Sequence, residues 1–268
     1  MTISDRLQSK PGLKRGAAML PSLFTIGNLF LGFSAIIYSL RLDFETAGQL
    51  IVVAVIFDML DGRIARMTGT TSEFGAQLDS LSDIVSFGVA PAIIAYQWGL
   101  ATLHKSFLAA FFFVMCAAIR LARFNVQRKV VDGRYFVGLP SPAAAGFVIS
   151  IVYFRPEPLS DRLGAAFTMT VLVIGAFLMV STLRYWSFKT LDLRSRRSYF
   201  SMVGVAALLA LVATEPSWAL LLWSCGYMAS GPVAYVIGLL RRKGDGGGSA
   251  LALPEPPAAT PLPPAPAA

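Results

Sequence analysis

Four aspartates between residues 58 and 83 have spacings that could build one reactive site. Asp58 and Asp61 are three residues apart, and Asp79 and Asp83 are four apart, so each pair lies on one face of a helix. Ionised carboxylates repel one another and are costly in apolar surroundings. A divalent cation removes both problems, and oxygen-only ligands suit Mg²⁺ or Mn²⁺, with Ca²⁺ also open, rather than zinc.

Small residues and one arginine surround these acidic pairs. Gly62, Ala65 and Gly75 remove side-chain bulk near the acidic face, which lets a ligand approach the helix backbone. Arg66 offers a planar fork of donors that suits phosphate. Together these residues predict a diphosphate-bearing substrate, clamped by two divalent ions about 3.5–4 Å apart.

The composition indicates that membrane helices position this site. Hydrophobic residues make up 55% of the 268 residues and charged residues only 14%, whereas a soluble domain carries about 25% charged residues. The apolar blocks have the length of membrane helices, without the short alternating segments of a β-barrel. We therefore expect an all-α integral membrane protein with about eight transmembrane helices, over residues 20–40, 46–66, 76–99, 106–124, 139–154, 164–183, 199–214 and 218–240.

The distribution of basic residues predicts the topology. With a cytoplasmic N-terminus, the connections place 19 Lys and Arg residues on the cytoplasmic side and 4 on the other side. The positive-inside rule therefore favours eight spans with both termini cytoplasmic. Asp58 and Asp61 then lie near the cytoplasmic end of the second helix, and Asp79 and Asp83 lie in the first turns of the third.

Composition also divides the chain into three parts. Residues 1–18 are predicted as a polar, basic leader, residues 19–243 as the membrane catalytic domain, and the Pro-, Ala- and Gly-rich residues 244–268 as a disordered tail. The net charge of +8 does not indicate nucleic-acid binding, because the basic residues lie in the connections between apolar blocks.

The acidic motif resembles the signature of the CDP-alcohol phosphatidyltransferases. All eight positions of Asp58-x2-Asp61-Gly62-x2-Ala65-Arg66-x8-Gly75-x3-Asp79-x3-Asp83 match it. The resemblance implies a helical membrane enzyme, usually a homodimer, with a six-helix core, here plus two further helices. Such an enzyme displaces CMP from a CDP-linked membrane lipid with an alcohol.

The resemblance also implies a role for each position of the motif. Three aspartates would bind the metal ions: Asp58, Asp61 and Asp79. Asp83 would complete the metal site and act as general base on the incoming hydroxyl. The cytidine diphosphate part would contact the remaining four residues: Gly62, Ala65, Arg66 and Gly75.

Four further stretches resemble the serine-using branch of this family: LPSLFTIGNLFLGFSAI, IRLARFNV, YFVGLPSPAAAG and LMVSTLRYWSFK. They favour CDP-diacylglycerol and L-serine as substrates, with glycerol phosphate, inositol phosphate or choline as alternative acceptors. Ser22 departs from this pattern, since that branch commonly carries Asn there. The resemblance covers roughly residues 18 to 240 and implies a bacterial cytoplasmic (inner) membrane.

Polar residues within these stretches suggest two further contacts. Thr25 and Asn28 are three apart and could line the nucleotide site. Arg120, Arg123 and Asn125 end an apolar helix on the cytoplasmic side, where an arginine could hold the carboxylate of serine. Arginines near a cytoplasmic helix end also commonly snorkel and set topology.

Two other classes of protein compete with an enzyme. Acidic residues within a membrane often mark the pathway of a cation transporter. Such a pathway needs polar groups across the whole bilayer, whereas these aspartates are confined to the cytoplasmic third. A scaffold protein would not require Gly62, Ala65, Arg66 and Gly75 at their observed spacings.

Overall fold

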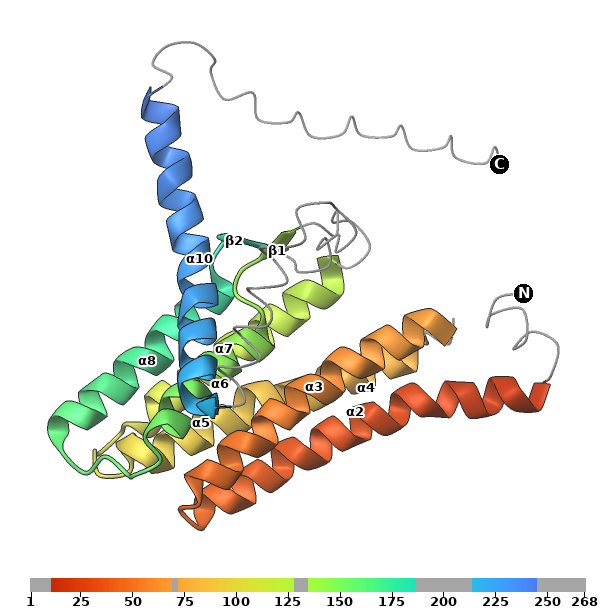
Figure 1. Cartoon of the computed structure of the whole chain (residues 1–268), viewed down its shortest axis with the longest axis horizontal. Helices are drawn as coiled ribbons and strands as arrows, with labels where there is room; N and C mark the ends of the chain where they lie inside the picture. Colours follow the sequence, from red (N-terminus) through yellow and green to blue (C-terminus); the bar gives the residue numbers. More distant parts are fainter. Residues whose placement is uncertain (1–10, 69–71, 128–134, 187–213, 245–268) are drawn as a thin grey trace, which may run out of the picture.

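The structure is a bundle of helices with most long axes slanted in one direction (Figure 1). It is a computed structural model that describes residues 11–68, 72–127, 135–186 and 214–244. Its α-helices are α2 (Pro11–Leu40), α3 (Phe44–Thr68), α4 (Glu73–Asp83), α5 (Ala90–Ala95), α6 (Phe107–Gln127), α7 (Ser141–Phe154), α8 (Arg162–Val180) and α10 (Pro216–Gly244). The π-helical turns Ile84–Val89 and Tyr96–Leu100 extend α4 and α5 into one helix, Glu73–Leu100.

The helices confirm a multi-pass membrane protein. Among the described residues, five helices are long and apolar enough to cross a bilayer: Leu23–Leu40, Glu73–Leu100, Phe107–Val126, Arg162–Val180 and Pro216–Gly238. The predicted count of eight is not confirmed. The apolar helix α7 has only 14 residues, and the predicted helix over 199–214 lies almost wholly outside the described residues.

The helix boundaries differ from the prediction mainly at the N-terminus. Helix α2 begins at Pro11 rather than at residue 20, so it extends into the predicted leader over residues 1–18. Helix α4 begins at Glu73 because the Ser72 hydroxyl accepts a hydrogen bond from the Gly75 backbone N–H at 3.0 Å, a side-chain cap on the first turn. Apart from Gly244, which ends α10, the predicted tail lies outside the described residues.

Two short strands accompany the helices of this all-helical fold. Strands β1 (Tyr135–Val137) and β2 (Arg184–Trp186) form an antiparallel pair in which Phe136 lies opposite Tyr185. Gly138 then turns the chain toward α7 with φ +81°, and its N–H donates to the Leu183 carbonyl at 2.8 Å. A β-carbon there would collide with the backbone carbonyl of Met179. The strands come from two of the stretches that resemble the serine-using branch.

Hydroxyl groups fasten α2 to the long helix that carries Asp79 and Asp83. Ser82 donates to the Thr25 carbonyl at 3.0 Å, and Ser86 donates to the Asn28 carbonyl at 2.9 Å. Gly32 permits this approach, because a β-carbon at Gly32 would lie 2.7 Å from the Ser86 Cα. These contacts fix the position of α2 beside the acidic residues.

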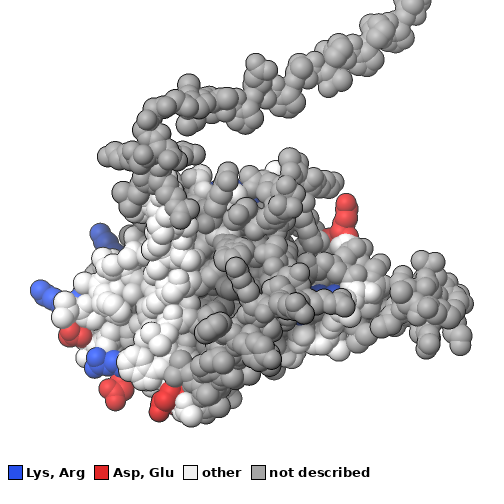
Figure 2. Space-filling model, turned by 45° about the horizontal axis from the view of Figure 1, so that its top comes forward, with Lys and Arg blue, Asp and Glu red and all other residues white. Residues whose placement is uncertain are grey.

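The exposed surface is largely apolar. In Figure 2 most of the visible described Lys, Arg, Asp and Glu side chains gather at the lower left, and much of the other described surface is uncharged. Large side chains such as Phe30, Phe111 and Phe177 are 66%, 62% and 62% exposed. Exposed aromatic side chains on long apolar helices suit contact with lipid.

We predict that Gly32→Ala destabilises the bundle by about 1–3 kcal/mol, the usual cost of overpacking a tight contact. The new methyl group meets the Ser86 backbone, which cannot rotate away. Thermal unfolding of the purified protein in detergent measures the effect as a fall in Tm. Gly238→Ala is the matched control, since a β-carbon there meets nothing within 4 Å. Equal Tm values for both variants would contradict the packing of α2 against Ser86.

Candidate metal centre and reaction site

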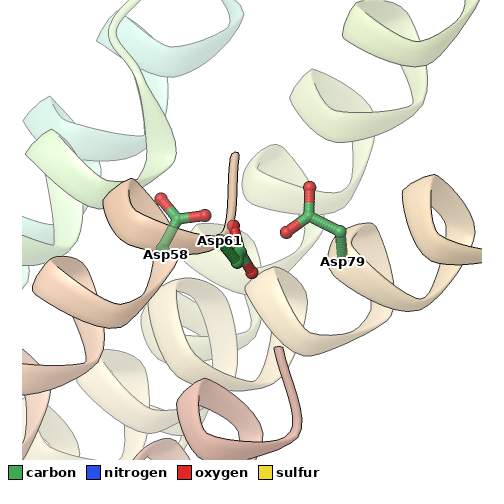
Figure 3. A group of neighbouring side chains, drawn as sticks. All are labelled: Asp58, Asp61 and Asp79. Atoms are coloured by element: carbon green, nitrogen blue, oxygen red, sulfur yellow. The ribbon is translucent and has the colours of Figure 1, made fainter. Parts of the chain in front are cut away.

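Three carboxylates, two from α3 and one from α4, lie close together (Figure 3). Asp58, Asp61 and Asp79 each offer an oxygen atom, and these atoms all lie within 4.8 Å of one another. Asp61 is buried, while Asp58 and Asp79 are partly buried. The structure thus brings together three residues that the sequence predicts as metal ligands.

The donor set fits a hard divalent cation. Three carboxylates this close repel one another unless a positive charge lies between them, and oxygen donors alone are the ligands that Mg²⁺, Mn²⁺ and Ca²⁺ take. Asn28 adds a further oxygen to the region. Its side chain is fully buried, and its Oδ1 atom has no hydrogen-bond partner among the described residues. Such an atom is costly to leave unsatisfied, so it suits contact with a ligand.

Asp83 lies beside the three converging carboxylates, with its side chain within hydrogen-bond reach of Asp58. It is the last residue of α4, is buried, and accepts a hydrogen bond from the Asn28 Nδ2 at 3.4 Å. It interacts electrostatically with Asp58 and Asp79, so it is their neighbour. It does not belong to the group of three oxygens within 4.8 Å of one another. Its proposed part in the metal site therefore remains a prediction.

Thr25 and Asn28, predicted to line the nucleotide site, contact the aspartates. The Thr25 hydroxyl donates to Asp61 Oδ2 at 3.0 Å, and Asn28 donates to Asp83 as described above. Ser82 and Ser86 hold the backbone of these two α2 residues. The prediction missed both serines, although their spacing of four residues places them on one face of a helix.

The structure describes the surroundings of the two motif glycines, Gly62 and Gly75. The Gly62 backbone N–H forms a hydrogen bond with the Asp61 carboxylate. A β-carbon at Gly75 would meet only the Ser72 hydroxyl, at 3.1 Å, so this first turn of α4 leaves space nearby. Ala65 and Arg66 belong to α3, and their side chains lie outside the described part of the chain. Their predicted contacts with cytidine diphosphate remain predictions.

The three residues predicted to bind serine have different surroundings. Arg120 donates to the Ser141 hydroxyl and interacts electrostatically with Asp83 and Asp58, so it faces the acidic residues. Arg123 donates to the Val180 carbonyl at 3.4 Å, at the end of α8.

Asn125 instead connects α6 to α4. Its Nδ2 atom donates to the Ser80 hydroxyl at 2.9 Å, and that hydroxyl lies 3.3 Å from the Asn125 Oδ1 atom. Ser80 directly follows Asp79 along α4. Asn125 thus supports the helix segment that carries a predicted metal ligand.

The fold and site define a multi-pass helical membrane protein with an acidic, oxygen-lined centre between α3 and α4. The chain belongs to the CDP-alcohol phosphatidyltransferase family, whose model matches residues 18–230. This finding confirms the resemblance seen in the acidic motif. It also favours an enzyme over the cation transporter and the scaffold.

Curated relatives show the branch of the family that the chain resembles. It is 37% identical over 224 residues to the CDP-diacylglycerol–serine O-phosphatidyltransferase of Helicobacter pylori strain 26695, covering 81% of this chain and 91% of the relative. It is 34% identical over 214 residues to the enzyme of the same name from Methanocaldococcus jannaschii, covering 80% and 92%. It is 38% identical over 168 residues to the archaetidylserine synthase of Methanothermobacter thermautotrophicus, covering 62% and 69%.

We predict that Asp61→Asn weakens Mn²⁺ binding by at least about tenfold, since even residues that support metal ligands change affinity by that factor. Titration calorimetry of the detergent-purified protein measures the affinity. Glu73→Gln is the control because it removes one carboxylate from an exposed position on α4. Unchanged affinity in Asp61→Asn would contradict the proposed metal centre.

Proposed function

We propose that this protein transfers the phosphatidyl group of CDP-diacylglycerol to L-serine, giving phosphatidylserine and CMP. The observation that carries the proposal is the convergence of Asp58, Asp61 and Asp79 beside the buried Asp83. Family membership and the names of the relatives support the same reaction.

The reaction exchanges one bond at phosphorus for another. The serine hydroxyl oxygen bonds to the phosphorus that carries diacylglycerol, and the bond from this phosphorus to the CMP oxygen breaks. Asp83 accepts the hydroxyl proton, and CMP leaves with the electron pair of the broken bond. A hydroxyl is a poor nucleophile until a positioned base accepts its proton, and the hydrogen bond from Asn28 fixes the orientation of Asp83.

The remaining motif residues hold the lipid's head group. Asp58, Asp61 and Asp79 would hold two divalent cations, either Mg²⁺ or Mn²⁺. These ions would supply positive charge to the diphosphate. Thr25 orients Asp61 through its hydroxyl. Gly62, Ala65 and Gly75 leave room for the nucleotide, and Arg66 supplies a phosphate-binding cation.

The proposal includes a membrane arrangement. Eight helices would cross a bacterial cytoplasmic membrane, with α3, α7 and the segment 199–214 added to the five apolar spans. Both termini would be cytoplasmic, and the protein would act as a homodimer. The acidic centre would then lie where the head group of a lipid in the cytoplasmic leaflet meets water-soluble serine.

An acceptor panel tests the reaction. With Mn²⁺ and CDP-diacylglycerol, we expect purified protein to release CMP with L-serine and to do so more slowly with glycerol phosphate, inositol phosphate or choline. The lipid product is identified by mass spectrometry. CMP release with none of these alcohols would overturn the proposed function, and preference for another alcohol would overturn only the choice of serine.

We also predict that Asp83→Asn lowers kcat by at least about 100-fold, the lower range for loss of a general base. CDP-diacylglycerol should still bind, because the three converging carboxylates remain. Asp161→Asn is the control, an exposed aspartate just before α8. Near-normal turnover by Asp83→Asn would exclude its role as the base.

A further inference from the structure

Helix α10 is fastened to the part of the bundle that contains Arg120. The hydroxyls of Ser150 on α7 and Ser224 on α10 lie 2.7 Å apart and share a hydrogen bond. The Tyr185 hydroxyl on β2 also donates to the Met228 carbonyl at 3.2 Å. Gly231 makes room for the Tyr185 ring, since a β-carbon there would collide with it. Helix α10 therefore has a defined position relative to α7 and the strand pair.

Tyr185 is a rigid support for this contact. Its side chain is fully buried, and β2 is held by its pairing with β1. Burial, together with the nearby Tyr227, raises the pKa of the Tyr185 phenol to about 12, so the group stays protonated and donates its hydrogen bond. The tyrosine and the strand pair thus hold the middle of α10 in place.

This arrangement places Tyr227 within electrostatic reach of Arg120. The Tyr227 ring lies 5.7 Å from the Tyr185 ring and stacks on Trp223 at 6.1 Å. Its phenol interacts electrostatically with the Arg120 guanidinium. Arg120 in turn faces Asp83 and Asp58. The Arg120 guanidinium on α6 therefore interacts both with a phenol from α10 and with the predicted base.

The chemistry of the acceptor explains why such a pair would be needed there. In serine only Cα and Cβ separate the hydroxyl from the carboxylate, so the group that binds the carboxylate must lie close to Asp83. The four aspartates would repel that carboxylate. Of the two arginines on α6 predicted to bind serine, Arg120 faces the aspartates, whereas Arg123 donates to the end of α8.

We propose that Tyr227 and Arg120 together form the carboxylate site for the acceptor, so that α10 supplies a specificity residue. The proposal rests on the serine transfer proposed above. The Arg120 guanidinium supplies the charge and the Tyr227 hydroxyl supplies a second donor to the carboxylate. Ser141 holds Arg120 from the start of α7, and Tyr185 is the positioning residue for Tyr227.

Tyr227→Phe tests the proposal with the ring retained. Loss of a hydrogen bond to a charged group should raise the KM for L-serine by about tenfold or more. The KM for CDP-diacylglycerol and kcat at saturating serine should change by less than about twofold, because neither depends on that bond. Tyr235→Phe is the matched control, on the same helix and 59% exposed. An unchanged KM for serine, or equal increases in both KM values, would overturn the proposal.

Acceptor analogues separate this proposal from the proposed function. Serinol and L-serine methyl ester keep the hydroxyl and lack the carboxylate, so we expect the wild-type protein to have a much higher KM for them than for serine. In Tyr227→Phe the difference between these KM values should be smaller. Wild-type protein that releases no CMP with serine would refute the function itself. Wild-type protein that uses serine and its methyl ester with equal KM would refute only the carboxylate site, and that measurement needs no variant.

Discussion

The repulsion among four carboxylates inside a helix bundle is the constraint on which the rest of the structure depends. Three of them converge on one point, and the fourth lies beside them within the same helix pair. The protein orients them with neutral donors: Thr25 contacts Asp61, and Asn28 contacts Asp83. These two neutral donors fix the directions of Asp61 and Asp83 without neutralising them. Arg120 places one positive charge near Asp83 and Asp58, and the remaining negative charge is left for a bound cation to balance.

The supports of these donors extend across several helices. Ser82 and Ser86 fix the backbone of α2, and Gly32 allows the close approach. On another side of the site, Asn125 ties α6 to the turn before Asp83 through Ser80. The acidic centre therefore depends on contacts from α2 and α6 as well as on the two helices that carry its aspartates. In the proposed reaction, the same frame orients both the diphosphate that is cleaved and the base.

The helices and the acidic site could be predicted from the sequence because each leaves a regular spacing of residue types along the chain. Apolar blocks indicated the helices, and the spacing of Asp58, Asp61 and Asp79 indicated one shared site. The features that the sequence did not predict are contacts between elements distant along the chain. The pairing of β1 with β2 and the partner of Asn125 have no helical or strand period that reveals them. Tyr227 also gave no signal, since a tyrosine in an apolar segment is ordinary; only the placement of α10 brings it to Arg120.

The central claim is that Asp58, Asp61 and Asp79 hold the metal ions on which the lipid diphosphate reacts. Crystals grown with Mn²⁺ and CDP-diacylglycerol, measured at the manganese absorption edge, test it most directly. The account predicts anomalous peaks among these three carboxylates, in contact with the diphosphate. Peaks elsewhere, or a bound lipid whose diphosphate lies away from the aspartates, would contradict it.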